Sequence, residues 1–118
     1  MRAPLIAIAA TAIPLVGCGS AAKVVHHRTV TIKLTEYRLT PQSITARKGR
    51  VTLVVVNTGR RTHNLVVSQD GTDIAATKAL WPGQHAELTV SLPAGAYRIA
   101  STVLNDDSLG EYGTLNVS

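Results

Sequence analysis

The stretch TVTIKLT, residues 29–35, alternates polar and apolar side chains at every step. Successive side chains of a β-strand point to opposite faces, so this period of two places Val30, Ile32 and Leu34 on one face and their polar neighbours on the other. We therefore expect a strand with one buried and one solvated face. A hydrophobic core has to lie against the buried face.

The same alternation continues toward the C-terminus, with turn signals between the segments. It recurs in residues 51–55, 65–67, 88–92, 97–99 and 115–117, and residues 57–59, 70–71, 82–83 and 93–95 carry the Gly, Pro, Asn and Asp of tight turns. Many short strands at regular spacing predict an all-β, antiparallel β-sandwich over residues 29–118. Val54, Val55 and Val56 are apolar on both faces and predict a central strand. One short helix is expected from Asp73 to Leu80, with Asp73 as its N-cap.

The N-terminal residues have the features of an export signal. Arg2 precedes an apolar run that ends in Leu15-Val16-Gly17-Cys18, which resembles the lipobox of bacterial lipoproteins. The resemblance implies a signal peptide over residues 1–17, lipidation of Cys18, a flexible tether over residues 18–28, and anchoring to the outer face of a bacterial membrane, in the periplasm or at the cell surface. An ordinary secretory signal that happens to end at a cysteine is the alternative.

Cysteine usage and charge limit the function classes. Cys18 is the single cysteine, so no disulfide can form within the chain. The formal net charge of +5 favours an anionic surface or an envelope protein as partner. The chain has one Trp, three Tyr and no Phe, too few aromatic platforms for a nucleic-acid groove. The basic residues gather in two turns, 47–50 and 60–61, that are expected at opposite ends of the sandwich.

Several phrases, in this order and spacing, resemble the cupredoxin family. They are residues 31–41, 44–53, 56–59, 62–67, 81–83, 88–90 and 92–97, then Gly110 and residues 113–117. The resemblance implies a Greek-key β-sandwich and, in the family, a type 1 copper held by a His, a Cys, a second His and usually a Met.

Three of the four residues at those positions differ from the family's ligands. His63 falls on the first His position, whereas Ser101 stands at the Cys position, Asp106 at the second His position and Glu111 at the Met position. A blue-copper site depends on a Cu–thiolate bond, which a serine hydroxyl cannot supply. We therefore expect no type 1 copper, and a copper electron carrier is only a remote alternative.

Two interpretations of the altered site remain. In one, the site has lost its metal and His63 forms a hydrogen bond or ion pair with Asp106 or Glu111, within a lipid-anchored binding or accessory module that has no cofactor. In the other, His63, Asp106 and Glu111, together with Asp107, bind Cu(II), Zn or Fe in metal capture or delivery.

No catalytic constellation is recognisable, so we expect no enzyme. Ser101, His63 and Asp106 are the residue types of a nucleophilic triad, but no nucleophile elbow or oxyanion hole accompanies them. Of the other polar and aromatic residues, Trp81 is expected to anchor the core or a loop, and His85 to lie at the surface. Glu36 and Tyr37 are expected to pack over the mouth of the sandwich.

Overall fold

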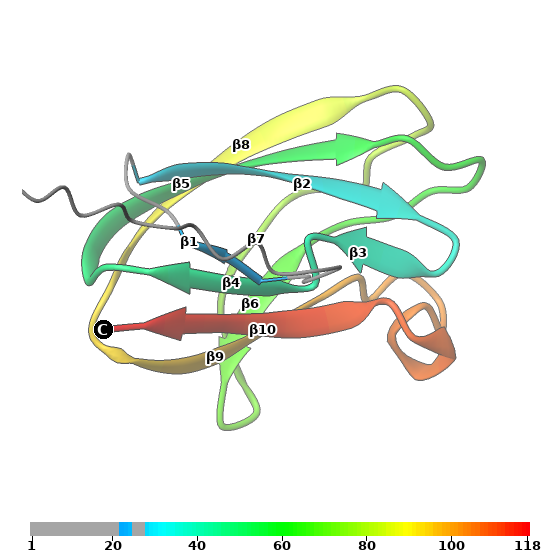
Figure 1. Cartoon of the computed structure of the whole chain (residues 1–118). Helices are drawn as coiled ribbons and strands as arrows, with labels where there is room; N and C mark the ends of the chain where they lie inside the picture. Colours follow the sequence, from blue (N-terminus) through cyan, green and yellow to red (C-terminus); the bar gives the residue numbers. More distant parts are fainter. Residues whose placement is uncertain (1–21, 25–27) are drawn as a thin grey trace, which may run out of the picture.

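The computed structural model describes residues 22–24 and 28–118 (Figure 1). Its strands are β1 (Ala22–Val24), β2 (Thr29–Thr35), β3 (Arg38–Thr40), β4 (Ser43–Ala46), β5 (Gly49–Asn57), β6 (Val66–Gln69), β7 (Thr72–Ala76), β8 (His85–Leu92), β9 (Gly95–Ala100) and β10 (Tyr112–Val117). A single 3₁₀ turn, η1 (Asp107–Leu109), is the helical element of these residues. The predicted signal peptide of residues 1–17 and Cys18 lie outside the described residues.

The strands form two sheets packed face to face, which confirms the predicted β-sandwich. One sheet has the order β1-β4-β10-β9-β6-β7 and the other the order β3-β2-β5-β8. Both are mixed, since β4 runs parallel to β1 and β10, and β2 runs parallel to β5. The parallel pairs depart from the purely antiparallel expectation, and they arise because β4 crosses to the other sheet before β5 returns beside β2.

The core consists of the inward positions of both sheets. In β2, Val30, Ile32 and Leu34 are buried while the residues between them are mostly exposed, as the alternation predicted. Burial of one such aliphatic side chain contributes about 1.5–3 kcal/mol. The remaining apolar core residues are Leu39, Ile44, Ala46, Val51, Leu53, Val55, Leu65, Val67, Leu80, Leu92, Tyr97, Ile99, Leu115 and Val117.

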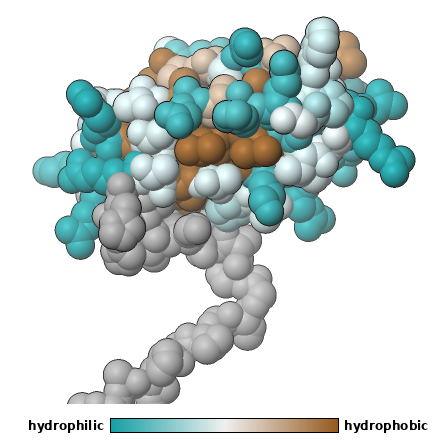
Figure 2. All heavy atoms as spheres, turned by 90° about the horizontal axis from the view of Figure 1, so that it is seen from above, coloured by the Kyte–Doolittle hydropathy of each residue, from teal (hydrophilic) through white to brown (hydrophobic). Residues whose placement is uncertain are grey.

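Strand β5 is central in its sheet, between β2 and β8, as the apolar run 54–56 predicted. Val55 points into the core, and Val54 and Val56 are half-buried on the outer face. Figure 2, which looks at the molecule from above, shows a hydrophobic area surrounded by hydrophilic and intermediate residues. The outer face of the sandwich is therefore polar at its margins and only locally apolar.

The helix predicted for residues 73–80 is wrong. Residues Thr72–Ala76 form β7, which pairs with β6 through a hairpin. Asp70 and Gly71 at its tip have φ angles of 50° and 81°, which suits a two-residue hairpin turn. The hairpin turn brings β7 into antiparallel pairing with β6. An isolated helix of this length forms too few hydrogen bonds to offset the free-energy cost of helix nucleation.

Strand β1 lies within the segment predicted to be a tether. It pairs in parallel with β4, with Ala22 opposite Ser43 and Val24 opposite Thr45. At least these three residues are part of the sheet. In the part of the chain that the structure describes, no helix has the length and apolar character needed to cross a bilayer.

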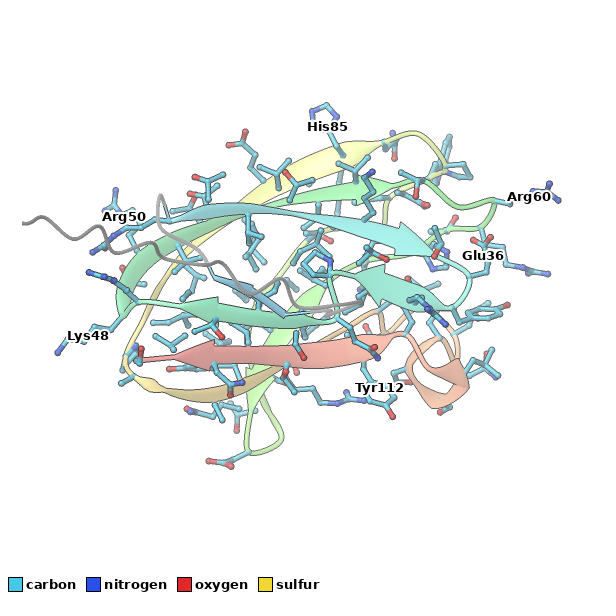
Figure 3. The ribbon with its side chains drawn as sticks, in the orientation of Figure 1. Glu36, Lys48, Arg50, Arg60, His85 and Tyr112 are labelled. Atoms are coloured by element: carbon cyan, nitrogen blue, oxygen red, sulfur yellow. The ribbon has the colours of Figure 1, made fainter. Side chains whose placement is uncertain are left out.

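The two basic turns lie at opposite ends of the sandwich, as predicted. Figure 3 shows Lys48 and Arg50 at one end, and Arg60 at the other, beside Glu36. The turn after β2, the segment after β5 and the loop between β9 and β10 all reach this second end (Figure 1). Three segments that are distant in sequence therefore meet there.

Candidate metal centre

His63 is held in place by its own backbone. Its N–H donates to the carbonyl of Leu80 at 3.1 Å, and the Leu80 N–H donates to the carbonyl of His63 at 2.7 Å. Asn57, at the end of β5, strengthens this junction because its Nδ2 donates to the carbonyls of Leu80 and Arg61 at 2.8 and 2.7 Å. The His63 side chain is completely buried. The imidazole therefore has a fixed position in the interior.

One ring nitrogen of His63 faces two carboxylates. Nδ1 lies 2.8 Å from Asp106 Oδ2 and 3.0 Å from Glu111 Oε1. Asp106 is 5% exposed and Glu111 is fully buried. One nitrogen and two oxygens, each able to bind a metal ion, thus converge within 4.8 Å of one another.

The other ring nitrogen faces a third carboxylate, that of Glu36. The distance from Nε2 to Glu36 Oε2 is 2.7 Å. Glu36 also accepts hydrogen bonds from the backbone N–H groups of Arg60 and Arg61, at 2.9–3.1 Å. A Cβ atom at Gly59 would collide with the Glu36 carboxylate, so any other residue there would force that carboxylate to shift away from its present hydrogen bonds.

The loop between β9 and β10 brings in Asp106 and Glu111. Ser101 and Glu111 close its base, with the Ser101 N–H donating to the Glu111 carbonyl at 3.0 Å. The Glu111 N–H donates to the Asp106 carbonyl at 3.1 Å, and Gly110 between them has a φ of 117°. That left-handed conformation favours glycine, and it turns the chain so that both acidic side chains point inward.

Ser101 orients Asp106. Its Oγ donates to Asp106 Oδ2 at 2.7 Å and accepts from the backbone N–H of Asn64 at 3.1 Å. Asp106 Oδ2 therefore receives hydrogen bonds from Ser101 and His63 together. Ser101 is itself fully buried, so this hydrogen bond serves to position the Asp106 carboxylate.

The site holds more acid than base, and the pKa values of its groups diverge. Hydrogen bonds from His63 and from the Arg60 and Arg61 N–H groups lower the pKa of Glu36 to about 2. Burial, with the charges of Asp106 and Glu36, raises the pKa of Glu111 to about 8. Burial alone would lower the pKa of His63, but its carboxylate partners outweigh that effect and raise it.

Both side-chain oxygens of Glu111 lack a hydrogen-bond partner among the described residues. His63 Nδ1 carries at most one hydrogen, and it is directed at Asp106, so Glu111 receives none. A buried carboxyl group without a partner costs about 1–3 kcal/mol or more. Such a group requires an explanation, and an ion bound beside it is one.

The profile of the cupredoxin-like domain family matches residues 6–111, which is most of the chain. The chain belongs to the cupredoxin-like family. No curated protein sequence matches it significantly.

Solved structures agree with this assignment. The cupredoxin-like domain superposes on reduced auracyanin from Roseiflexus castenholzii with a TM-score of 0.71 and 22% identity, over 77% of this chain and 97% of that one. For rusticyanin from Thiobacillus ferrooxidans the TM-score is 0.69 at 14% identity, over 86% and 85% of the chains. Auracyanin A from Chloroflexus aurantiacus, a "blue" copper protein, gives 0.64 at 20% identity, over 76% and 99%. At these identities the likeness establishes the fold alone.

The donors around His63 do not fit a type 1 copper. Such a site needs a cysteine thiolate, and the described residues of this cupredoxin-like domain place Ser101 beside Asp106 instead. The donors do fit a harder or borderline ion such as Zn, Fe or non-blue Cu(II), which accept imidazole and carboxylate together. Glu36 on Nε2 supports this fit, because metal-binding histidines commonly donate their second N–H to a carboxylate.

The structure brings His63, Ser101, Asp106 and Glu111 together, and these are the four positions that the resemblance to the cupredoxins singled out. Asp107 lies outside the cluster, and its Oδ2 is 3.8 Å from Arg98 Nη1. Glu36 is the site residue that the sequence analysis missed. Its position in the turn directly after β2 was the available signal, but the sequence analysis assigned it a packing role only.

His85 is exposed, as predicted (Figure 3). Trp81 is 67% exposed, so its interpretation as a packing anchor is wrong.

Proposed function

We propose that this cupredoxin-like domain binds a divalent metal ion through His63 Nδ1, Asp106 and Glu111, and serves in metal capture or delivery. The observation that carries the proposal is the carboxyl group of Glu111, which is fully buried and has no hydrogen-bond partner among the described residues. A cation between the three donors would coordinate that carboxylate and offset its burial. Glu36 would keep the Nε2 hydrogen and leave the Nδ1 lone pair for the metal.

The donor set indicates which ions to test first. Two carboxylates and one imidazole suit Zn, Fe(II) and Cu(II), and they lack the thiolate that selects blue copper. When bound, the ion would supply positive charge at a point where three carboxylates and one histidine converge. The chain's own residues would hold and orient it, with Ser101 fixing Asp106 and the Arg60 and Arg61 N–H groups fixing Glu36.

We further propose that the domain acts outside the cytoplasm, tethered to a bacterial membrane through a lipidated Cys18. The sequence of residues 15–18 supports this proposal. The net positive charge of the chain suits an anionic surface or an envelope protein as partner. Mass spectrometry of the membrane-extracted protein tests it. A mature chain that begins at an acylated Cys18 is the expected result, and an unmodified cysteine contradicts it.

A second candidate function, an accessory module that binds no metal, is favoured by one observation. Both nitrogens of His63 already have carboxylate partners, at 2.7 Å from Glu36 and 2.8 Å from Asp106. A protonated His63 between them would be a self-sufficient buried ion pair. The two candidate functions differ in whether the Glu111 carboxylate coordinates a metal ion.

The test is a titration of the full chain with Zn(II), Cu(II) and Fe(II), together with elemental analysis. One ion per chain is expected for the metal proposal. Glu111→Gln removes one donor at constant size and should weaken affinity at least about tenfold. Asp107→Asn, in the same loop but outside the cluster, is the matched control and should leave affinity unchanged. Absence of stoichiometric binding, or equal loss in both variants, supports the accessory module instead.

A further inference from the structure

A pocket of about 330 Å³ lies beside the His63 cluster, on its solvent side. Its wall includes Tyr37 from the turn after β2, Arg61 and Thr62 from the segment after β5, and Asn105 and Asp106 from the loop after β9. All three segments that build the cluster therefore also line the pocket. Its volume suits a small molecule rather than a macromolecular segment.

Two residues of the pocket wall contact His63 directly. Asp106 Oδ2 lies 2.8 Å from Nδ1, and the Tyr37 ring stands edge-on to the imidazole with ring centroids 6.4 Å apart. Asp106 is also one of the three proposed metal donors. Asp106 is thus common to the pocket wall and the proposed metal centre, so a molecule in the pocket would meet a carboxylate that holds the ion.

The chemistry of the pocket favours an anion. Its lining residues include Arg61, which carries a guanidinium group, and Tyr37, Thr62 and Asn105, which carry hydroxyl and amide donors, beside the apolar Val103 and Leu104. Asp106 is the single acid in the wall, and it is engaged by His63 and Ser101. Among the described residues, no carboxylate lies within ion-pair distance of the Arg61 side chain, whose exposed guanidinium is available to a ligand.

Three protein donors leave a metal ion with open coordination positions, which an exogenous ligand fills. We propose that a small oxyanion, with carboxylate or phosphate oxygens, occupies this pocket, pairs with Arg61 and completes the coordination of the metal. This inference rests on the proposed function. The cation and the oxyanion would be taken up together, so the domain recognises the metal as an anionic complex rather than as a bare ion.

Coupled binding is the measurable consequence. The affinity of the full chain for Cu(II) or Zn(II) is compared in a non-coordinating buffer, in succinate and in phosphate, at equal ionic strength and equal free-ion activity. We expect an increase of about tenfold with at least one of the two anions. Succinate and phosphate separate the carboxylate source from the phosphate source, and either increase supports the inference.

Reciprocity gives a second readout. Because coupling between two ligands is mutual, the metal must raise the affinity of the labelled anion by the same factor, which equilibrium dialysis measures. Arg61→Gln should abolish the increase, measured as the ratio of the affinity with the anion to the affinity of the same variant in the non-coordinating buffer. Arg38→Gln, an exposed arginine next to Tyr37 that does not line the pocket, is the matched control and should keep the full increase.

The outcomes separate this inference from the proposed function. Metal binding that neither anion strengthens, or an increase that survives in Arg61→Gln, overturns the oxyanion pocket and leaves the metal centre standing. If Arg61→Gln and Arg38→Gln lose the anion-dependent increase equally, the increase depends on the overall charge of the domain, and this result also overturns the oxyanion pocket. If no metal binds in any of the three media, both proposals fail.

Discussion

Glu111 Oε1 lies 3.0 Å from His63 Nδ1 and yet receives no hydrogen bond from it. The single hydrogen that Nδ1 can carry is directed at Asp106, so Glu111 is a buried acid held beside a histidine by position alone. Without a metal, the charge of a protonated His63 lowers the pKa of Glu111, but burial and the charges of Asp106 and Glu36 outweigh this effect and raise that pKa to about 8. The stability of the metal-free domain must then depend on pH.

The first prediction concerns this pH dependence. The pKa of Glu111 is about 8 in the folded state, above its ordinary value of 4.5, because of burial first and of Asp106 and Glu36 next. A raised pKa stabilises the fold fully below pH 4.5, and that contribution is lost as pH rises through 8. The raised pKa of His63 acts in the same direction.

Glu111→Gln isolates the contribution of Glu111. In the presence of a chelator, the variant and the wild type should have similar free energies of unfolding near pH 5. At pH 8.5 the variant should be more stable by a few kcal/mol, since each pKa unit is worth about 1.4 kcal/mol. Urea denaturation across this range is the measurement. A constant difference between the two proteins at all pH values would show that Glu111 does not titrate in this window.

The second prediction concerns Glu36, whose carboxylate lies 2.7 Å from His63 Nε2. Glu36→Gln removes the negative charge but keeps a hydrogen-bonding side chain, so the pKa of His63 should fall. NMR titration of the imidazole measures it. Glu87→Gln, on the exposed face of β8, is the control and should leave that pKa unchanged.

Acid stability gives Glu36 a second signature. Its pKa of about 2 lies below the ordinary value of 4.5, so its contribution is present above pH 4.5 and is lost as pH falls toward 2. Glu36→Gln should therefore be less stable than wild type at neutral pH, with the difference closing in acid. A difference that grows on acidification contradicts the assignment.

The third prediction concerns Gly59. Its missing side chain lets the turn of residues 57–61 close on the Glu36 carboxylate, and a Cβ atom there would collide with it. Gly59→Ala should destabilise the domain by about 1–3 kcal/mol. Glu36→Ala removes the colliding group, so Gly59→Ala should cost clearly less in that background. If Gly59→Ala lowers the free energy of unfolding equally in the wild type and in Glu36→Ala, the strain does not arise between residue 59 and Glu36.

The sequence predicted the sandwich well because its determinants are local. Alternation in residues 29–35 and the turn residues between strands depend only on neighbours along the chain. The helix predicted for residues 73–80 failed because strand pairing prevailed: after the Asp70-Gly71 turn, β7 forms hydrogen bonds with β6. Three Ala residues in that segment carry too little side-chain information to separate helix from strand.

The site was predictable in part. The resemblance to the cupredoxins singled out His63, Ser101, Asp106 and Glu111, but the sequence left open whether the acidic loop folds toward His63. It could not decide between the neighbours Asp106 and Asp107, because their directions depend on η1 and on the left-handed Gly110. Glu36 approaches from a different hairpin, and only the folded turn with Gly59 reveals why its carboxylate reaches His63.

The final prediction tests the positional equivalence between this site and a type 1 copper site. Ser101→Cys together with Asp106→His would supply the thiolate and the second imidazole next to His63, with Glu111 in place of the weak axial ligand. Because Ser101 Oγ lies 2.7 Å from Asp106 Oδ2, the new ligands start close to one another. We expect Cu(II) to give the double variant the intense visible colour of a Cu–thiolate bond.

Ser101→Cys with Asp107→His is the matched control. Asp107 lies beside Arg98 outside the cluster, so this variant should not develop the same spectrum. A colourless copper adduct of the first variant, with the fold intact by circular dichroism, would mean that Ser101 and Asp106 do not occupy the positions of the lost ligands.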